Sequence, residues 1–471
     1  MKTSPRLYKS IACVTFVAIV CACSPKTTKD IKLSPQPHFD PRSFGATADG
    51  ITFDTAALQK AIDACAGTGG SVVLTGGVFL TKPLELRGNM TLHIEKNAVL
   101  LGSPDIADYP VKLPSNFWVK SLCRSLLYAE KADGLTISGQ GSIDGNCQAM
   151  NIGPEIRKVG NEAHRPSLLR VFRSENVTVR NITFRNPTMW TQLYSECDNL
   201  LIEGVTVDAP PDCANLDGID VCDSHHVVIR DCNVRSEDDG ICLKSHLQRG
   251  LKDILVENNI VHVYKANAIK LGTGTVGPIS DITIRNNKIT YAKYAGLILA
   301  SVDGSHVRNI LVEDLEMKNV GQPIFIRLGK RREPPGSIDG ITINRLRVTS
   351  TNPENGPACV ISGIPDARVQ NVRIKDSTFE MPGGQKGVPG IPPEKETAYP
   401  QSNMFWNTPG YAFFVRHADG VVMENVTVSK LAGDVRPWLS EVNARVEQVN
   451  CRDIGVVPAN PTSAKEATEA H

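Results

Sequence analysis

A short cassette of β-branched and aliphatic residues recurs through most of the chain and limits what the chain can fold into. In each copy two aliphatic side chains flank a more variable residue, which is the alternation of a half-buried β-strand. The copies are Leu135–Ile137, Val177–Val179, Leu200–Ile202, Val227–Ile229, Ile254–Val256, Ile282–Ile284, Ile310–Val312, Ile341–Ile343 and Val372–Ile374. From Val177 onward they start roughly 23 to 31 residues apart, a spacing typical of solenoids.

The intervals between cassettes are too short for a helix of normal length, which argues against leucine-rich and helical repeats. We therefore predict an all-β chain that forms a single right-handed parallel β-helix, with two or three strands in each coil. Asparagines recur in the turns, where side-chain amides of successive coils can stack and bond to one another. They are Asn181, Asn258, Asn259, Asn286 and Asn287.

The ends of the solenoid differ from its middle. The segment Asp54–Ala64 has helical spacing, with Asp54 or Thr55 as N-cap, and we expect this short helix to cover the open N-terminal end. Residues Met381–Gly410 are rich in Pro and Gly and predict a long loop before a coil returns at Val421–Met423. We expect the β-helix domain to span residues 39–457 and the tail 458–471 to be disordered.

The first 23 residues have a basic start and an apolar run, Ile11–Ala22, which predicts a secretory leader. Its end, Val20-Cys21-Ala22-Cys23, resembles a bacterial lipobox, so we predict lipidation of Cys23; an ordinary signal peptide is the alternative. The protein would then be exported and anchored to a membrane by lipid alone, in the periplasm or at the cell surface. Residues 24–38 would form a flexible tether.

Composition excludes several kinds of partner and cofactor. The formal net charge is +1 and charged residues make up 21% of the chain, which argues against nucleic acid as the main partner. No Cys-x-x-Cys pair occurs, so we expect no zinc site, and we predict neither a metal nor another cofactor. We expect a monomer.

The stretch Asn215–Ser245 carries the candidate site because it repeats one acidic motif, Asp217-Gly218-Ile219 and Asp239-Gly240-Ile241, on successive coils. Stacked coils lie about 4.8 Å apart, so Asp217, Asp238 and Asp239 should converge. Like charges at this distance raise one another's pKa. Such a cluster is either an acid/base set or a cation site.

The strands that follow these motifs can be aligned, and the alignment predicts which side chains face away from the coil interior. One outward column contains Asp220, Cys242, Lys270, Ile298 and Phe325, and a second contains Cys222, Lys244, Gly272, Ala300 and Arg327. A third column, just before the strands, contains Asp217, Asp239, Asn267, Ala295 and Gln322. The polar members gather on the coils of Asp217, Asp239 and Asn267, which predicts a binding groove there.

Together these motifs resemble glycoside hydrolase family 28, the polygalacturonase family of pectin-degrading β-helix enzymes. The resemblance extends from about Phe44 to Asp314. It is carried by Phe44-Gly45-Ala46 with Asp49-Gly50, Gly139–Gly145, Arg165-Pro166, Asn186-Pro187 with Trp190, Asn215–Asp220, and Asp238-Asp239-Gly240 with Lys244-Ser245.

The resemblance implies inverting hydrolysis of an α-galacturonosyl-type bond in pectic polysaccharides or oligosaccharides. Asp238 would be the general acid, and Asp217 and Asp239 would position and deprotonate the attacking water. An inverting enzyme is expected to separate acid and base by roughly 6.5 to 9.5 Å. Asn215 and Lys244 would contact the substrate. We expect the segments from Asp105 to Asn116 and from Cys147 to His164 to wall off one end of the groove and favour an exo mode.

Two positions depart from the family pattern. Where the family has Gly-His-Gly and Arg-Ile-Lys, this chain has Ala266-Asn267-Ala268 and Ile298-Leu299-Ala300. The histidine that supports the acids and the basic pair that holds a substrate carboxylate are therefore absent from their expected places. Asn267, Lys270 and Arg327 are the substitutes we predict for substrate binding, and the substrate shifts towards a side-chain linkage or another pectic sugar.

Two other classes of function remain open at this point. A β-helix polysaccharide lyase could use the acids to bind calcium, and would form an unsaturated product. A carbohydrate-binding surface lipoprotein that has lost its activity would also fit the two departures.

Overall fold

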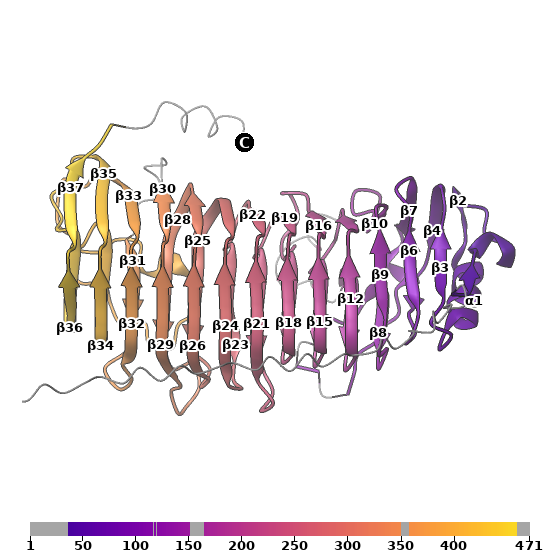
Figure 1. Ribbon diagram of the computed structural model, residues 1–471, viewed down its shortest axis with the longest axis horizontal. Helices are drawn as coiled ribbons and strands as arrows, with labels where there is room; N and C mark the ends of the chain where they lie inside the picture. The colour runs from indigo at the N-terminus through magenta and orange to yellow at the C-terminus, as the bar shows by residue number, and fades with distance from the viewer. Residues whose placement is uncertain (1–35, 116, 119, 151–163, 350–357, 459–471) are drawn as a thin grey trace, which may run out of the picture. The chain divides into compact units, whose positions relative to one another are not determined.

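A computed structural model describes residues 36–115, 117–118, 120–150, 164–349 and 358–458, and from Pro37 onward these residues form a solenoid of parallel β-strands. All pairings between its named strands are parallel, and strands far apart in sequence lie side by side along the stack (Figure 1). The predicted parallel β-helix is therefore confirmed. The leader, Cys23, most of the tether and the tail from residue 459 lie outside the described residues and stay predictions, as do the proposed domain boundaries.

Each coil adds one strand to each of three ladders. Ladder 1 contains β1 (His38–Phe39), β3 (Ser71–Leu74), β6 (Thr91–Ile94), β9 (Thr136–Gly139), β12 (Glu175–Arg180), β15 (Asp198–Glu203), β18 (His225–Arg230), β21 (Leu251–Glu257), β24 (Ile279–Arg285), β26 (His306–Glu313), β29 (Ser337–Asn344) and β32 (Val369–Lys375). Ladder 2 contains β2 (Asp49–Phe53), β4 (Gly77–Thr81), β7 (Ala98–Gly102), β10 (Ser142–Asp144), β13 (Thr183–Arg185), β16 (Thr206–Asp208), β19 (Asn233–Ser236), β22 (Ile260–Val263), β27 (Glu316–Lys318), β30 (Arg347–Thr349), β33 (Thr378–Gly383), β35 (Thr427–Ala432) and β37 (Arg452–Val456).

Ladder 3 carries the candidate site. It contains β5 (Leu84–Glu85), β8 (Ser125–Glu130), β11 (Ser167–Phe172), β14 (Gln192–Ser195), β17 (Ile219–Cys222), β20 (Ile241–Ser245), β23 (Ile269–Thr275), β28 (Val320–Leu328) and β31 (Cys359–Ser362). Three long strands pass from one ladder to the next: β25 (Lys288–Ser301), β34 (Phe413–Glu424) and β36 (Leu439–Val449).

The cassettes occupy ladder 1 in the register that their sequence predicts. Val227 pairs with Ile254, and Ile254 with Ile282, so equivalent aliphatic positions stack along the solenoid. Both flanking residues of a cassette are buried, whereas the middle residue, such as Val228, is partly exposed. Burial of a Val, Leu or Ile side chain contributes roughly 1.5 to 3 kcal/mol, and a one-residue slip would expose the whole row.

The turn asparagines perform two different roles. Asn258 and Asn286 adopt positive φ, +58° and +54°, a left-handed conformation that Asn tolerates better than most residues. Asn259 and Asn287 are buried, and the Nδ2 of Asn259 donates to Oδ1 of Asn287 at 2.9 Å. The predicted amide stacking between coils is confirmed at this pair.

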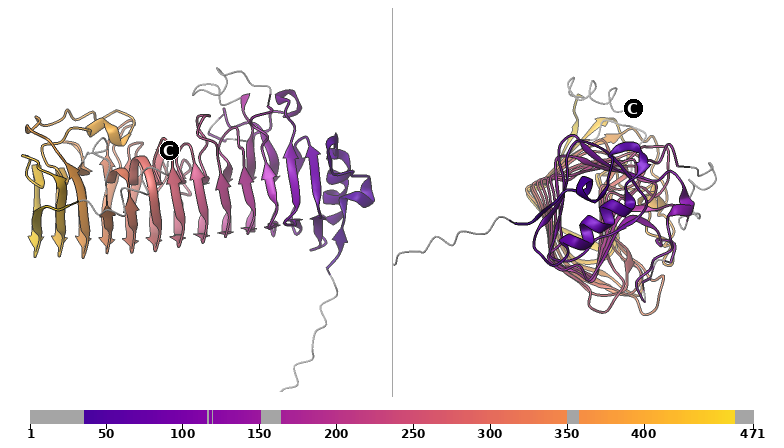
Figure 2. Two further views of the ribbon diagram at one scale, coloured as in Figure 1. Left: turned by 90° about the horizontal axis from the view of Figure 1, so that it is seen from above. Right: turned by 90° about the vertical axis from the view of Figure 1, so that its right-hand side faces the viewer.

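Helix α1 (Thr55–Cys65) lies across the N-terminal end of the stack, where the right-hand view of Figure 2 looks along the solenoid. Its apolar face, including Leu58 and Ile62, joins the main core, as expected for a cap. Asp54 occupies the N-cap position but makes no side-chain cap bond. Its carboxylate instead accepts hydrogen bonds from the backbone N–H groups of Thr47 and Ala48.

The described residues also contain three short 3-10 helices: η1 (Pro41–Phe44), η2 (Ile106–Asp108) and η5 (Ser402–Phe405). The Pro- and Gly-rich segment between β33 and β34 contains η5 and no strand, which agrees with the predicted long loop. The left view of Figure 2 shows loops rising from the coils over two stretches of the stack, with a lower stretch between them. Within the described ranges, no helix is long and apolar enough to cross a membrane.

Candidate active site

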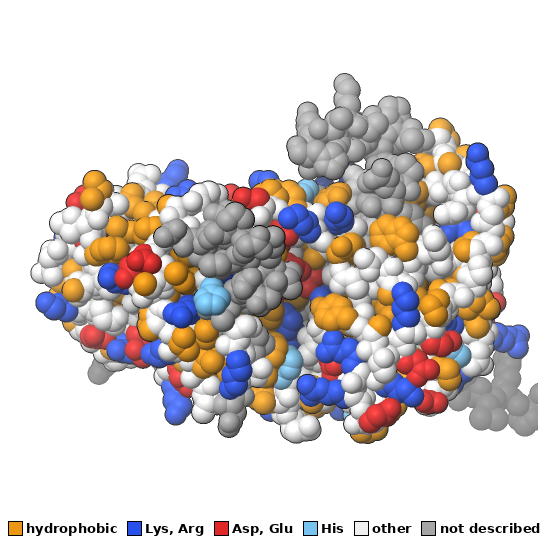
Figure 3. Space-filling view, turned by 180° about the vertical axis from the view of Figure 1, so that it is seen from behind, with side chains coloured by type: hydrophobic (Ala, Val, Ile, Leu, Met, Phe, Trp, Pro, Cys, Tyr) orange, Lys and Arg blue, Asp and Glu red, His pale blue; other side chains and the backbone are white. Residues whose placement is uncertain are grey.

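A pocket of about 320 Å³ opens on ladder 3 where β17, β20 and β23 lie side by side. The face seen in Figure 3 is hollowed near its middle, with acidic and basic side chains gathered around the hollow. The lining residues are Trp118, Ser121, Leu122, Met189, Trp190, Asn215, Asp217, Asp238, Asp239, Lys244, His246, Lys270, Thr273, Gly274, Val276, Asp303, Arg331, Arg332 and Tyr399. Six of the eight predicted catalytic or binding residues are among them; Asn267 and Arg327 are not.

Strand register places the outward column of the site as the alignment predicts. Asp220 pairs with Cys242, Cys242 with Lys270, Lys270 with Ile298, and Ile298 with Phe325. Because parallel strands stack at about 4.8 Å, the charged members of this column are near neighbours.

The column before the strands is held by backbone hydrogen bonds. The N–H of Gly218 donates to the carbonyl of Asp239 at 2.9 Å, and that of Gly240 donates to the carbonyl of Asn267 at 2.8 Å. A Cβ on Gly218 would lie 2.5 Å from the carbonyl oxygen of Gly240, so only glycine allows the coils to approach this closely. The repeated Asp-Gly motif thus brings Asp217 and Asp239 together.

Asp239 is a buried carboxylate with a charged partner. Its Oδ2 accepts a hydrogen bond from Lys270 Nζ at 2.6 Å, and its Oδ1 accepts one from Asn267 Nδ2 at 2.7 Å. Burial acts to raise the pKa of Asp239, but Lys270 and Asn267 outweigh it and leave the pKa below its usual value. Asp239 is therefore ionised at neutral pH.

Asp238 is next to this ion pair, and its pKa is shifted in the opposite direction. Burial raises the pKa of Asp238 to about 7, and the negative charge of Asp239 acts in the same direction. The backbone N–H of Asp239 donates to Asp238 Oδ1 at 2.8 Å and orients the carboxyl group. A carboxyl with this pKa can hold a proton near neutral pH and deliver it to a leaving group.

Asp217 is the third member of the cluster and is only 3% exposed. Burial, followed by the charges of Asp238 and Asp220, raises the pKa of Asp217 well above its usual value. Its Oδ1 has no hydrogen-bond partner, and its Oδ2 lies 4.0 Å from Lys244 Nζ. Burial therefore favours the protonated form of both Asp217 and Asp238.

The three carboxyl groups lie closer together than the sequence analysis expects for an inverting acid and base. Oxygens of Asp217, Asp238 and Asp239 lie within 4.8 Å of one another, compared with the expected 6.5 to 9.5 Å or so. The reason is that all three project from adjacent coils on the same side of the solenoid, so an attacking water would lie beside the carboxyls rather than on a line between them.

The same carboxylates are close enough together to act as ligands for a cation. However, Lys270 Nζ already contacts Asp239 at 2.6 Å, and Lys244 lies near Asp217, so two ammonium groups provide the neutralising charge that a metal would bring. The donor set of the described residues therefore fits a proton-transfer site better than a calcium site.

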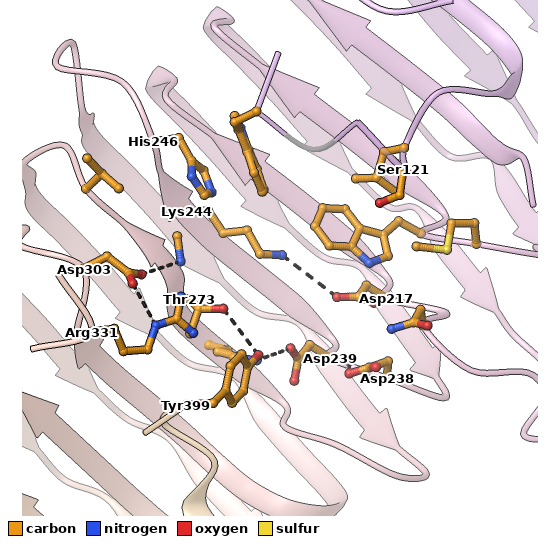
Figure 4. Close-up of a pocket in the computed structure, with 18 of the residues that line it drawn as sticks. Ser121, Asp217, Asp238, Asp239, Lys244, His246, Thr273, Asp303, Arg331 and Tyr399 are labelled. Atoms are coloured by element: carbon orange, nitrogen blue, oxygen red, sulfur yellow. Dashed lines mark hydrogen bonds and ion pairs between the residues drawn. The ribbon is translucent and has the colours of Figure 1, made fainter. Parts of the chain in front are cut away.

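Lys244 connects the acids to the aromatic wall of the pocket. Its Nζ forms an ion pair with the fully buried Asp220 and lies 3.8 Å from the ring centroid of Trp190. Burial raises the pKa of Asp220 to about 6 although Lys244 opposes that shift. Trp118 and His246 also line the pocket, and their rings stack with centroids 3.2 Å apart. Figure 4 shows Lys244 directed towards Asp217.

Two apolar contacts cover ladder 3 on either side of the pocket. On the N-terminal side Phe117 and Leu122 pack on Phe172 and Leu193, which are outward residues of β11 and β14. On the C-terminal side Phe405 of η5 packs with a cluster of outward residues of β25, β28, β31 and β34: Ala295, Ile298, Ala300, Phe325, Val360 and Phe414. The outward columns are thus correctly predicted, but on either side of the pocket they lie beneath covering segments.

The two remaining predicted binding residues, Asn267 and Arg327, bond to other protein residues and do not line the pocket. Asn267 is buried and bonds to Asp239, where the family pattern has histidine. Arg327 is 1% exposed, and its guanidinium donates to Ser362 Oγ and to the carbonyls of Gly363, Glu394 and Lys395. The prediction that Arg327 contacts substrate disagrees with this placement, because protein carbonyl groups already accept the hydrogen bonds of its guanidinium.

Several lining residues were not predicted from the sequence. Trp118, Arg332 and Tyr399 come from loops and carry no periodic signal, and His246 and Asp303 follow strands of ladder 3. Tyr399 reaches the pocket because Arg327 and Arg416 hold the preceding backbone at Pro392–Lys395. A basic run after Arg327 is visible in the sequence and is the only signal that could have indicated Arg331 and Arg332.

The pKa values predict how activity should depend on pH. We expect kcat/KM to fall as the pH rises above about 7, because Asp238 then loses the proton that it must donate. The activity should persist down to about the ordinary Asp value of 3.8, below which Asp239 also becomes protonated. Initial rates from pH 4 to 9 at constant ionic strength test this profile, and an activity that rises steadily through pH 8 contradicts it.

Comparison with protein families shows the family to which the chain belongs. A model of glycosyl hydrolases family 28 matches residues 115–386. An exo-poly-alpha-D-galacturonosidase from Dickeya chrysanthemi is 26% identical over 393 residues, which cover 72% of this chain and 62%, less than two thirds, of that protein. An endo-polygalacturonase from Pectobacterium carotovorum subsp. carotovorum is 24% identical over 354 residues, covering 69% of this chain and 86% of that protein.

Solved structures show the same fold. A family 28 exopolygalacturonase from Yersinia enterocolitica matches with a TM-score of 0.70 and 21% identity, covering 90% of this chain and 79% of that chain. A hyperthermoactive exopolygalacturonase from Thermotoga maritima matches with a TM-score of 0.63 and 22% identity, covering 74% of this chain and 88% of that chain.

Proposed function

Because the chain belongs to glycosyl hydrolases family 28, as its motifs predict, we propose that it hydrolyses the bond of a galacturonosyl-type unit in pectic saccharides. The observation that carries this proposal is the division of the carboxyl cluster into two kinds of group. Asp239 is ionised by its contact with Lys270, while Asp238, its neighbour in sequence, holds a proton to about pH 7. General acid/base hydrolysis needs both kinds within reach of one bond.

In the proposed mechanism Asp238 donates its proton to the glycosidic oxygen as the bond to the leaving sugar breaks. A water held beside Asp217 and Asp239 attacks the anomeric carbon from the other face, and Asp239 accepts its proton. Each carboxylate oxygen has two lone pairs, so Asp239 can accept from this water while it keeps Lys270 and Asn267. The product would have the inverted configuration, which NMR of the freshly released anomer tests directly. A retained configuration would assign Asp217 the role of nucleophile.

An exo mode is supported by the two apolar contacts on ladder 3. A polymer that runs along the coils would have to displace Phe117 and Leu122 on one side, or Phe405 on the other. A chain end can enter the pocket from solvent without displacing either. The relatives include proteins named as exo-acting and endo-acting, so the comparisons alone do not decide between the modes.

On a polymeric pectic substrate we expect reducing ends to accumulate while the viscosity stays almost constant, because an exo enzyme shortens chains one end at a time. The measurement is simultaneous viscometry and reducing-sugar analysis, with a commercial endo-acting hydrolase as the reference. An early fall in viscosity at the same extent of cleavage would rule out the exo mode.

The experiment that tests the function is incubation of a form starting after Cys23 with a panel of pectic polymers and their oligosaccharides. Chromatography of the products should show a saturated sugar. An unsaturated product, recognised by the absorbance of its new C=C bond, would instead identify a lyase. Binding without any product would identify a carbohydrate-binding protein.

A further inference from the structure

One wall of the pocket offers hydrogen-bond donors and lies apart from the carboxyl cluster. It is formed by Arg331 and Arg332, which follow β28, and by Tyr399, which precedes η5. Figure 4 shows Arg331 and Tyr399 on one side of the pocket, with Asp217 and Asp238 on the other. We call these three residues the donor wall.

Both carboxylate oxygens of Asp303, the acid on this side, are already hydrogen-bonded. Asp303 Oδ1 accepts from Arg331 Nε at 2.9 Å, and Oδ2 accepts from the backbone N–H groups of Gly274 and Thr275 at 3.1 and 3.2 Å. Asp303 is buried, so this arrangement is fixed. The bond is made through Nε, and the two terminal nitrogens of Arg331 have no hydrogen-bond partner in the part of the chain that is described.

The hydroxyl of Tyr399 is also committed in a way that makes it a donor. Its oxygen accepts hydrogen bonds from Lys270 Nζ at 3.1 Å and from Thr273 Oγ1 at 3.3 Å. A phenolic oxygen has two lone pairs and one hydrogen, so the remaining group is the O–H itself. Its ring lies between two cations, 5.4 Å from Lys270 Nζ and 5.5 Å from Arg331 Cζ.

Arg332 completes the wall at its exposed edge. It makes no hydrogen bond or ion pair with any residue in the described ranges, although it lines the pocket. His246, which also lines the pocket, adds no positive charge. Burial lowers the pKa of His246 to about 3, with Lys244 and Arg332 acting in the same direction, so the imidazole is neutral.

We propose that the donor wall of Arg331, Arg332 and Tyr399 binds the carboxylate of the uronosyl unit on the side of the scissile bond away from Asp217. The two guanidinium groups and the hydroxyl offer donors, and a carboxylate offers acceptors. A neutral hexose would present hydroxymethyl groups that cannot satisfy two arginines. This inference rests on the proposed function, because it specifies which chemical group of the substrate selects it.

The inference also explains why the strand positions beneath η5 can be apolar. Ile298 and Ala300 are fully buried under Phe405, so no side chain at those positions could reach a substrate. The positive charge comes instead from the loop after β28 and faces the pocket from beyond the covering segment.

The test compares Arg332→Gln and Tyr399→Phe on a galacturonate oligosaccharide and on the same oligosaccharide with its carboxyl groups reduced to alcohols. For Arg332→Gln we expect kcat/KM on the acidic substrate to fall roughly 10- to 100-fold, the worth of a charge-assisted hydrogen bond. The kcat/KM on the reduced substrate should change little, so the ratio of kcat/KM on the acidic substrate to that on the neutral one should fall. Arg308→Gln, an exposed arginine of β26 outside the pocket, is the matched control.

Binding measurements separate failure of this inference from failure of the proposed function. Calorimetry with the acidic oligosaccharide is carried out on Asp238→Asn, with and without Arg332→Gln. If wild type cleaves nothing but binding still depends on Arg332, the function is wrong and the donor wall stands. If wild type cleaves the acidic substrate and neither Arg332→Gln nor Tyr399→Phe alters the acidic-to-neutral preference, the donor wall is wrong and the function stands.

Discussion

Asp238→Asn is expected to lower kcat by roughly 10²- to 10⁴-fold, the usual contribution of a general acid, and to leave the affinity for saccharide almost unchanged. The amide is close in size to the carboxyl group, so the Asp239 N–H that donates to Asp238 Oδ1 keeps an acceptor. The amide cannot release a proton to a leaving sugar. The falling limb of the pH profile near 7 should also disappear, because the group responsible for it is gone.

The measurement is single-turnover hydrolysis together with calorimetric binding. Asp231→Asn is the matched control, because Asp231 lies in the same coil, is exposed at a turn and has a positive φ that Asn tolerates. If the Asp238→Asn variant keeps most of its kcat, the general acid is instead Asp217, whose pKa is also raised.

Lys270→Met is expected to lower the free energy of unfolding by about 3 to 5 kcal/mol at pH 7, the cost of leaving one member of a buried ion pair alone. Asp239 would keep Asn267 but lose its only cation within hydrogen-bond distance in the described chain. Burial would then raise the pKa of Asp239 above its usual value.

The sign of the pH effect follows from this reversal. In the wild type the lowered pKa of Asp239 contributes stability above about pH 3.8, and that contribution is lost as the pH falls further. In the variant a raised pKa makes the folded state bind the proton more tightly, so stability falls as the pH rises from 3.8. The loss relative to wild type should therefore be smaller at pH 5 than at pH 7.

Urea denaturation at both pH values measures this difference. Lys252→Met, an exposed lysine 4.0 Å from Asp281, should change stability by less than about 1 kcal/mol. The double variant Lys270→Met, Asp239→Asn should recover part of the loss, because no charge is then left buried. A Lys270→Met loss that is equal at the two pH values would show that packing, and not the charge of Asp239, sets the effect.

The sequence predicted the coils and their register because the interior of a β-helix imposes a strict physical period. Val227, Ile254 and Ile282 are equivalent because each must fill the same slot in the next coil. The same period placed Asp220, Cys242 and Lys270 in one outward column, as the strand register shows.

The sequence does not show which segment will cover an outward residue. Alternation indicates that Arg327 points out of the coil, but not that Glu394 and Lys395 will pass over it and accept its donors. Tyr399 and Trp118 enter the pocket on loops whose paths depend on tertiary contacts, and no period in the sequence reports those paths.

The departure at Asn267 shows a related limit. The absence of histidine left open a protein without activity, whereas the structure provides two donors to Asp239, from Asn267 and Lys270 of the next coil. Asn267 and Lys270 bind the same carboxylate, and motif positions considered one at a time do not reveal this.

The covering segments have a consequence for how such a protein can change over evolutionary time. The aspartates belong to the coils, whereas Phe117 and Phe405, which bound the pocket, belong to insertions between strands. Shortening an insertion by a few residues would lengthen the accessible groove by one or more 4.8 Å steps without altering a coil. Descendants of one gene could thereby exchange a preference for chain ends for internal cleavage, and a protein engineer could make the same exchange by excising η5 while leaving the catalytic coils untouched.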